Sequence, residues 1–142
     1  MTLRHITFIR PHIRDMRASD AMEPLAFAVL SARTPEHIER AFYDERIERV
    51  PLDLDTGLVA ISVETFTARR AYQIAAAYRR RGVPVIMGCY HPTLLPEEAG
   101  RHCDAVCIGD AEGAWERLLA DADQGQLQKR YKQERPPSLD EG

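Results

Sequence analysis

Apolar and polar positions along this chain form two kinds of segment, short continuous apolar runs and longer amphipathic stretches. The clearest apolar run covers residues 58–63 (LVAISV), and its β-branched side chains predict a strand that is buried on both faces of a sheet. Residues 67–81 follow with apolar side chains at three- and four-residue spacing, which predicts an amphipathic helix that ends at Gly82.

The same strand–helix unit recurs along the chain. Strands are expected at residues 3–9, 38–44, 58–63, 83–87 and 105–108, with a further edge strand at 127–132, and helices at 25–32, 67–81, 96–102 and 110–122. Residues 10–21 are polar and predict a loop. Strands that alternate with helices favour a parallel sheet with right-handed crossovers. We therefore expect an α/β, flavodoxin-like (Rossmann-like) doubly wound parallel sheet of about five strands in the order 2-1-3-4-5.

The length of the chain indicates the number of domains, and its net charge bears on the class of partner. A chain of 142 residues fits one domain, expected at residues 1–133, and the proline-containing residues 134–142 predict a linker. The net charge of −3 disfavours a general nucleic-acid-binding role, because such domains carry a basic face.

The membrane and redox signals indicate a cytoplasmic protein. No apolar run approaches the ~20 residues that a membrane-spanning helix needs. The three cysteines, Cys89, Cys103 and Cys107, are odd in number and lack a paired spacing, so a disulfide framework is not expected. Cys103 and Cys107 are interpreted as small buried apolar residues.

Glycines mark the place where a ligand is expected. In an open parallel sheet, ligands bind beyond the carboxyl ends of the strands, and Gly88 and Gly109 directly follow two predicted strands. Glycine there lets a flat ligand approach the backbone, although either glycine alone fits a tight turn equally well. Ser62 and Thr65 offer hydroxyl groups beside them, while Thr65 also fits a plain helix cap.

Rival chemistries lack their motifs. The turn after the first predicted strand, residues 10–15 (RPHIRD), contains no glycine, which excludes a dinucleotide fingerprint, and a P-loop is absent. No Ser-His-Asp or Cys-His pair can be placed from the sequence. We therefore expect no catalytic machinery within this domain.

Residues 59–119 resemble the cobalamin-binding domain that precedes the catalytic barrel of many radical S-adenosylmethionine (SAM) enzymes. That broad group includes anaerobic Mg-protoporphyrin monomethyl ester cyclase and the hopanoid-modifying enzymes. The matching phrases are Ile61-Ser62-Val63 with Thr65 and Thr67, Gly88 with His91-Pro92-Thr93, Pro96-Glu97-Glu98-Ala99, Gly109-Asp110-Ala111-Glu112-Gly113 and, earlier, Met22-Glu23-Pro24-Leu25.

The resemblance implies a cobalamin (B12) module that binds a corrinoid at the carboxyl edge of the sheet. The corrin ring would lie across the strand ends and the nucleotide tail would run into the sheet edge. It also implies a C-terminal radical SAM domain in cis, which would carry a 4Fe-4S cluster and SAM and make the full-length protein a radical SAM methyltransferase or oxidative cyclase. The cofactor-binding residues expected on this basis are Ser62, Thr65, Gly88, Cys89, His91, Pro92, Gly109 and Glu112.

Two positions depart from the family pattern. Cobalamin domains of the methionine synthase kind carry Asp-x-His-x-x-Gly after the first strand, and here only His12 survives, as a candidate cobalt ligand or a solvated loop histidine. Cys89 stands where the family usually has a second glycine, and its side chain would crowd the nucleotide tail. A degenerate domain of the same fold that only docks to a partner is therefore the alternative, followed by a free-standing binder of another small molecule.

Overall fold

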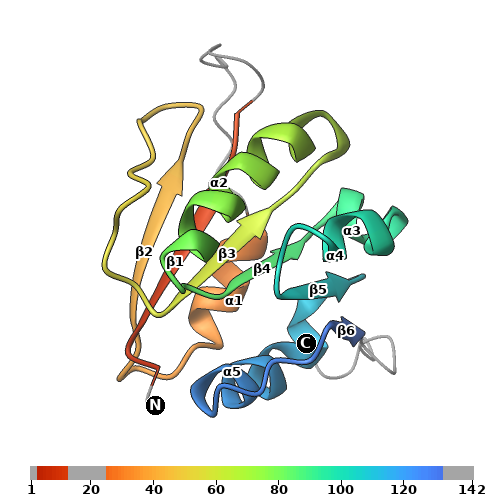
Figure 1. Cartoon of the computed structure of the whole chain (residues 1–142). Coiled ribbons are helices and arrows are strands. Elements are labelled where there is room, and N and C mark those ends of the chain that lie inside the picture. Colours follow the sequence, from red (N-terminus) through yellow and green to blue (C-terminus); the bar gives the residue numbers. More distant parts are fainter. Residues whose placement is uncertain (1–2, 13–24, 133–142) are drawn as a thin grey trace.

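One six-stranded parallel sheet organises the chain, whose computed structural model describes residues 3–12 and 25–132 (Figure 1). The strand order is β2-β1-β3-β4-β5-β6, so the predicted order 2-1-3-4-5 is confirmed and β6 extends it within the predicted edge-strand region. Every pairing is parallel. The strands are β1 (His5–Arg10), β2 (Glu39–Asp44), β3 (Leu58–Ser62), β4 (Val85–Gly88), β5 (Ala105–Ile108) and β6 (Arg130–Lys132).

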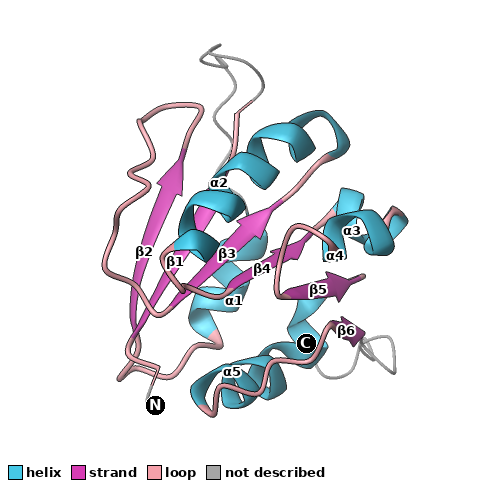
Figure 2. Cartoon of the chain, in the orientation of Figure 1, coloured by secondary structure: helices cyan, strands magenta, loops and turns pink. Residues whose placement is uncertain are grey.

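Helices cover both faces of this sheet (Figure 2), as the doubly wound prediction requires. One apolar cluster joins α1 and α5 to the sheet, and the other joins α2 and α4 to the opposite face. The helical segments are α1 (Leu25–Ala32), α2 (Ala68–Arg80), α3 (Tyr90–Leu94), α4 (Pro96–Gly100) and α5 (Trp115–Asp123), with 3-10 turns at η1 (Thr65–Thr67) and η2 (Ala111–Ala114).

The central strand shows why the apolar pattern was informative. Ala60 of β3 belongs to the cluster beneath α1 and α5, while Val59 and Ile61 belong to the cluster beneath α2. Both faces of β3 are therefore buried, as its continuous apolar run predicted. Tyr78 of α2 is fully buried, and its hydroxyl donates a hydrogen bond to the Pro51 carbonyl at 2.6 Å.

The sequence predicts no helix between the strand at 83–87 and the helix at 96–102, where residues 88–92 are expected to form a loop. This expectation is wrong, because Tyr90–Leu94 fold into the short helix α3. The Leu95 N–H donates a helical hydrogen bond to the His91 carbonyl at 2.8 Å. Pro92 lies in the first turn, where a missing N–H costs no helical hydrogen bond. The expected helix at 110–122 begins as the 3-10 turn η2 and becomes an α-helix only at Trp115.

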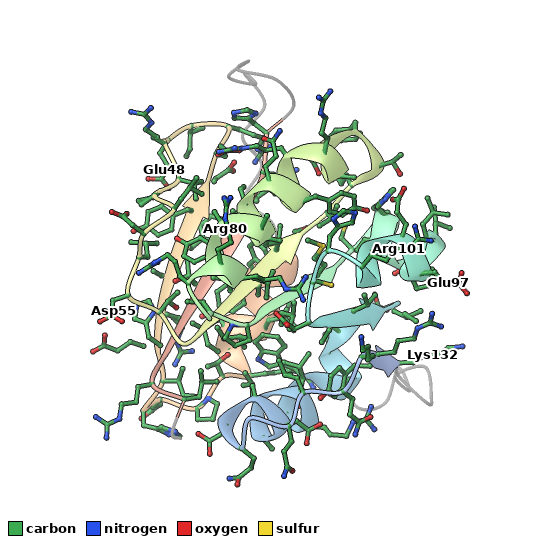
Figure 3. All side chains as sticks on the ribbon, viewed as in Figure 1. Glu48, Asp55, Arg80, Glu97, Arg101 and Lys132 are labelled. Atoms are coloured by element: carbon green, nitrogen blue, oxygen red, sulfur yellow. The ribbon has the colours of Figure 1, made fainter. Side chains whose placement is uncertain are left out.

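The positions of the charged side chains and of the cysteines follow the expectations from the sequence. Charged side chains such as Arg80, Glu97 and Arg101 lie on the outside of the molecule (Figure 3). All three cysteines are free, and burial raises the pKa of the Cys103 and Cys107 thiols to about 12. No helix in the described part of the chain has the length and apolar character needed to cross a membrane. The predicted linker at 134–142 lies outside the described residues.

Candidate cofactor site

A cavity of about 360 Å³ opens at the carboxyl edge of the sheet, and we refer to it as the edge cavity. It lies at the ends of β3, β4 and β5, and α1, α3 and η2 contribute to its walls. Small-molecule pockets span roughly 300–1,000 Å³, so this volume suits part of a large ligand rather than all of one. We call the apolar part of the lining the inner lining; it includes Phe27, Leu30, Ala60, Ile86, Cys107 and Trp115. The rest of the lining comes from the strand ends and the segments that follow them, and it includes Ser62, Gly88, Cys89, Tyr90, Thr93, Gly109 and Glu112.

The inner lining is apolar and includes two buried aromatic side chains, those of Phe27 and Trp115. The ring of Phe8 packs beneath it, with its centroid 5.1 Å from that of Phe27 and 5.9 Å from that of Trp115. The Trp115 indole N–H donates to the Thr34 hydroxyl at 3.0 Å, so the buried indole keeps a hydrogen-bond partner. This lining therefore presents a preformed apolar surface that suits a flat aromatic group.

The two glycines serve different purposes. Gly109 adopts a φ of +76°, which an L side chain rarely tolerates, so the turn interpretation explains it. Gly88 has no such constraint, and a Cβ added there would make only an ordinary contact, 3.5 Å from the Cβ of Cys107. Because Cys107 itself lines the edge cavity, the missing side chain of Gly88 keeps cavity space open.

Cys89 carries the backbone strain of the site. Its φ of 86° and ψ of −159° fall in a region that is essentially restricted to glycine. The Thr93 hydroxyl donates to the Cys89 carbonyl at 2.8 Å and accepts from the Gly109 N–H at 2.9 Å. Sequence reasoning did not select Thr93, although it stands in the matching phrase His91-Pro92-Thr93, which was the available signal.

Three predicted site residues do not line the edge cavity: Thr65, His91 and Pro92. His91 is buried, with 4% exposure, and its ring points away from the cavity toward a carboxylate. Its Nε2 lies 2.6 Å from Glu98 Oε2, and its Nδ1 lies 3.4 Å from the Thr65 hydroxyl oxygen. The structure therefore brings together Ser62, Gly88, Cys89, Gly109 and Glu112, and leaves the other three outside the cavity lining.

Glu112 belongs to a contact that fastens η2 to the end of α1. The Arg33 guanidinium donates to the Glu112 carbonyl at 3.0 Å and lies 3.5 Å from the Glu116 carboxylate. Arg33 directly follows α1, whose Phe27 and Leu30 also line the edge cavity. Arg33 therefore ties together two segments that build the walls.

His12 contacts a buried carboxylate at the same edge of the sheet. Its Nε2 lies 3.6 Å from Glu45 Oε1, and its backbone N–H donates to the same oxygen at 3.3 Å. Burial acts to raise the pKa of Glu45, but the hydrogen bonds from Arg70 and from the His12 backbone outweigh it, so the pKa is lowered. Among the described residues, no cluster of three or more His, Cys, Asp or Glu side chains is arranged to hold a metal ion.

The sequence of this chain matches one known family and two known proteins. Residues 25–119, more than half of the chain, match the family described as B12 binding domain. The chain is 36% identical over 108 residues to bacteriochlorophyllide d C-8(2)-methyltransferase of Chlorobaculum tepidum, covering 75% of this chain and 24% of that protein. It is 33% identical over 111 residues to bacteriochlorophyllide d C-12(1)-methyltransferase of the same organism, covering 77% and 24%.

A solved structure shows the same fold. The structure of the cobalamin-dependent S-adenosylmethionine radical enzyme OxsB with aqua-cobalamin bound matches with a TM-score of 0.68 at 16% identity. The match covers 89% of this chain and 19% of that chain. The present chain thus spans about a quarter of the length of the curated relatives and a smaller share of OxsB.

Proposed function

The chain belongs to the B12-binding domain family, and on that premise we propose that its edge cavity receives part of a bound cobalamin. The observation that carries this proposal is Gly88 in the cavity lining, where the backbone does not require glycine and an added Cβ would lie 3.5 Å from the Cβ of Cys107. A glycine that the backbone does not require leaves the cavity wall without a side chain there, so a flat ligand can approach the main chain.

The residues present fit this cofactor. A volume of about 360 Å³ suits one arm of cobalamin rather than the whole cofactor, so the corrin ring would lie outside the cavity, over the strand ends. The rings of Phe27 and Trp115 suit the flat base of the nucleotide tail. Polar groups are available around this lining, from the Ser62 hydroxyl and the Glu112 side chain. We assign cofactor contact to Ser62, Gly88, Cys89, Gly109 and Glu112.

His12 stays a predicted cobalt ligand. Metal-binding histidines commonly have a carboxylate partner that orients the ring, and Glu45 is placed to do this for His12. When bound, cobalamin supplies a cobalt atom that can accept and pass on a methyl group. The task of this chain is to hold the cofactor and to orient it at the sheet edge.

The complete protein is proposed to be larger than this chain. Both methyltransferases are about four times as long as the matched segment, and the OxsB match is a radical enzyme that also uses S-adenosylmethionine. We propose a C-terminal radical SAM domain in cis with a 4Fe-4S cluster, and an overall methyl-transfer reaction, in the cytoplasm. Three free cysteines support that compartment.

Titration of the purified 142-residue chain with hydroxocobalamin tests the cofactor assignment. We expect a shifted visible spectrum with micromolar affinity for the natural sequence and for Ala120→Trp, which introduces the same side chain at an exposed position on α5. Gly88→Trp is expected to abolish the shift while retaining the circular dichroism spectrum. Binding retained by a folded Gly88→Trp variant would place the site elsewhere. An unchanged spectrum with the natural sequence would favour the docking module.

A further inference from the structure

A polar cluster joins three helices behind the edge cavity. It consists of Tyr72 on α2, His91 on α3 and Glu98 on α4. The Tyr72 hydroxyl lies 2.7 Å from Glu98 Oε2 and 3.0 Å from His91 Nε2, and His91 Nε2 lies 2.6 Å from the same Glu98 oxygen. Every pair in the cluster is therefore within hydrogen-bond distance, and none of the three side chains lines the cavity.

The proton positions in the cluster follow from its geometry. The Tyr72 hydroxyl donates its one proton to Glu98, so His91 must carry a proton on Nε2 to donate to that carboxylate and to the tyrosine oxygen. The hydrogen bonds from Tyr72 and His91 lower the pKa of Glu98 and keep it ionised. Burial and the neighbouring Glu98 raise the pKa of Tyr72, which keeps the phenol protonated. The cluster thus fixes one orientation of the His91 ring.

The tyrosine is itself held in place. The ring of His102 stacks on the ring of Tyr72, with centroids 3.9 Å apart and planes 10° from parallel. Tyr72 belongs to α2, the longest helix of the described chain, which packs on the sheet through Ile74 and Tyr78. Tyr72 is therefore a firm anchor for the less regular segment that contains His91.

The helix α3 needs such an anchor because five residues are too few to be stable as a helix alone. One side of the segment, through Cys89, Tyr90 and Thr93, forms a wall of the edge cavity, and His91 points the other way. The His91 backbone N–H also donates to the Val63 carbonyl at 3.1 Å, just beyond β3. The position of this cavity wall therefore depends on the contacts of His91.

We propose that His91, oriented by Tyr72 and Glu98, is a positioning residue that fixes α3 as a wall of the cofactor cavity and does not itself touch the cofactor. This proposal rests on the proposed function of the edge cavity. It assigns His91 of the matching phrase a role in preorganising the site, which distinguishes it from the residues that contact the ligand.

Tyr72→Phe tests this role, with Tyr78→Phe as the matched control on the same helix. Tyr72→Phe loses the hydroxyl contacts to Glu98 and His91, whereas Tyr78→Phe loses a hydroxyl bond to Pro51, which is far from α3 in sequence. We expect Tyr72→Phe to weaken hydroxocobalamin affinity about tenfold at a temperature where both variants are fully folded. Tyr78→Phe is expected to retain the affinity, even if its melting temperature falls. Unchanged affinity in Tyr72→Phe would overturn the proposal.

The bound visible spectrum separates positioning from direct contact with the cobalt. In His91→Gln, the spectrum of the bound cofactor is expected to match that of the natural sequence, with weaker affinity only. A changed bound spectrum would identify His91 as a cofactor contact and overturn the proposal. If the natural sequence binds no cobalamin, the proposed function fails. Hydrogen exchange then tests separately whether Tyr72 holds α3 in place. Faster exchange of the Leu95 amide in Tyr72→Phe, but not in Tyr78→Phe, supports the anchor, and equal exchange contradicts it.

Discussion

Thr93 and Gly109 are joined at the edge cavity by a hydrogen bond of 2.9 Å, which the Gly109 N–H donates to the Thr93 hydroxyl oxygen. The same hydroxyl donates its proton to the Cys89 carbonyl at 2.8 Å. One small side chain therefore connects the turn after β4 with the end of β5. Because the three residues line the edge cavity together, this bond links cavity shape to the relative position of two strand ends.

Thr93→Val removes this link while keeping the shape of the side chain. We expect the free energy of unfolding to fall by about 0.5–1.5 kcal/mol, the usual net value of an intramolecular hydrogen bond. Urea denaturation measures the loss, and hydroxocobalamin titration is expected to show severalfold weaker binding. Thr93→Ser keeps the hydroxyl and is expected to bind with nearly the natural affinity. Equal affinities in the valine and serine variants would show that the link does not shape the site.

Cys89→Gly is expected to stabilise the protein. The φ of 86° at Cys89 is strained for any side chain, and removing that strain outweighs the greater backbone entropy that glycine loses on folding. We expect a net gain on the order of 1 kcal/mol in urea denaturation, with cobalamin affinity equal to or tighter than that of the natural sequence.

Cys103→Gly is the control for this prediction. Cys103 is buried, and Cys89 is the only non-glycine residue with a positive φ in the described part of the chain. Glycine at 103 therefore relieves no such strain and removes buried atoms, so this variant is expected to lose stability. A loss of stability in Cys89→Gly would contradict the strain argument.

Thiol labelling is expected to report on occupancy of the edge cavity. Burial raises the pKa of Cys103 and Cys107 to about 12, so these thiols react slowly, whereas Cys89 is partly exposed. Iodoacetamide is expected to label Cys89 first, and saturating hydroxocobalamin is expected to slow that labelling. Mass spectrometry of tryptic peptides measures both rates. Labelling of Cys89 at an unchanged rate in the presence of bound cobalamin would place the cofactor elsewhere.

The sequence specified the sheet better than the site. The apolar run of β3 and the spaced apolar residues of α2 depend on local pattern, so both could be predicted before the structure was seen. The carboxyl edge followed from topology alone. The helix α3 could not be predicted, because its five residues are held by tertiary contacts to Val63 and Tyr72.

The inner lining of the cavity was also beyond sequence reasoning. Phe27 and Trp115 are 88 positions apart in the sequence, and only the packing of α1 and α5 on one sheet face brings them together. The direction of the His91 side chain likewise depends on Glu98, which lies on another helix. A sequence motif identifies candidate residues of a site, but which of their side chains face the ligand depends on contacts with neighbouring helices and strands.

Glu45 is expected to make the stability of the fold depend on pH. Its buried carboxylate bonds to Arg70 at 2.8 Å, and its pKa lies below the ordinary value of 4.5. A carboxyl whose pKa is lowered by folding stabilises the protein above its unfolded pKa, and that contribution is lost as the pH falls through the folded pKa. We expect Glu45→Gln to lower the free energy of unfolding by about 1.5–3 kcal/mol at pH 7, and to reduce the further loss of stability below pH 4.5.

Urea denaturation between pH 7 and pH 3 measures both effects, with Glu36→Gln at an exposed position as the control. A parallel pH profile in Glu45→Gln and Glu36→Gln would show that the Arg70 contact does not set the acid sensitivity.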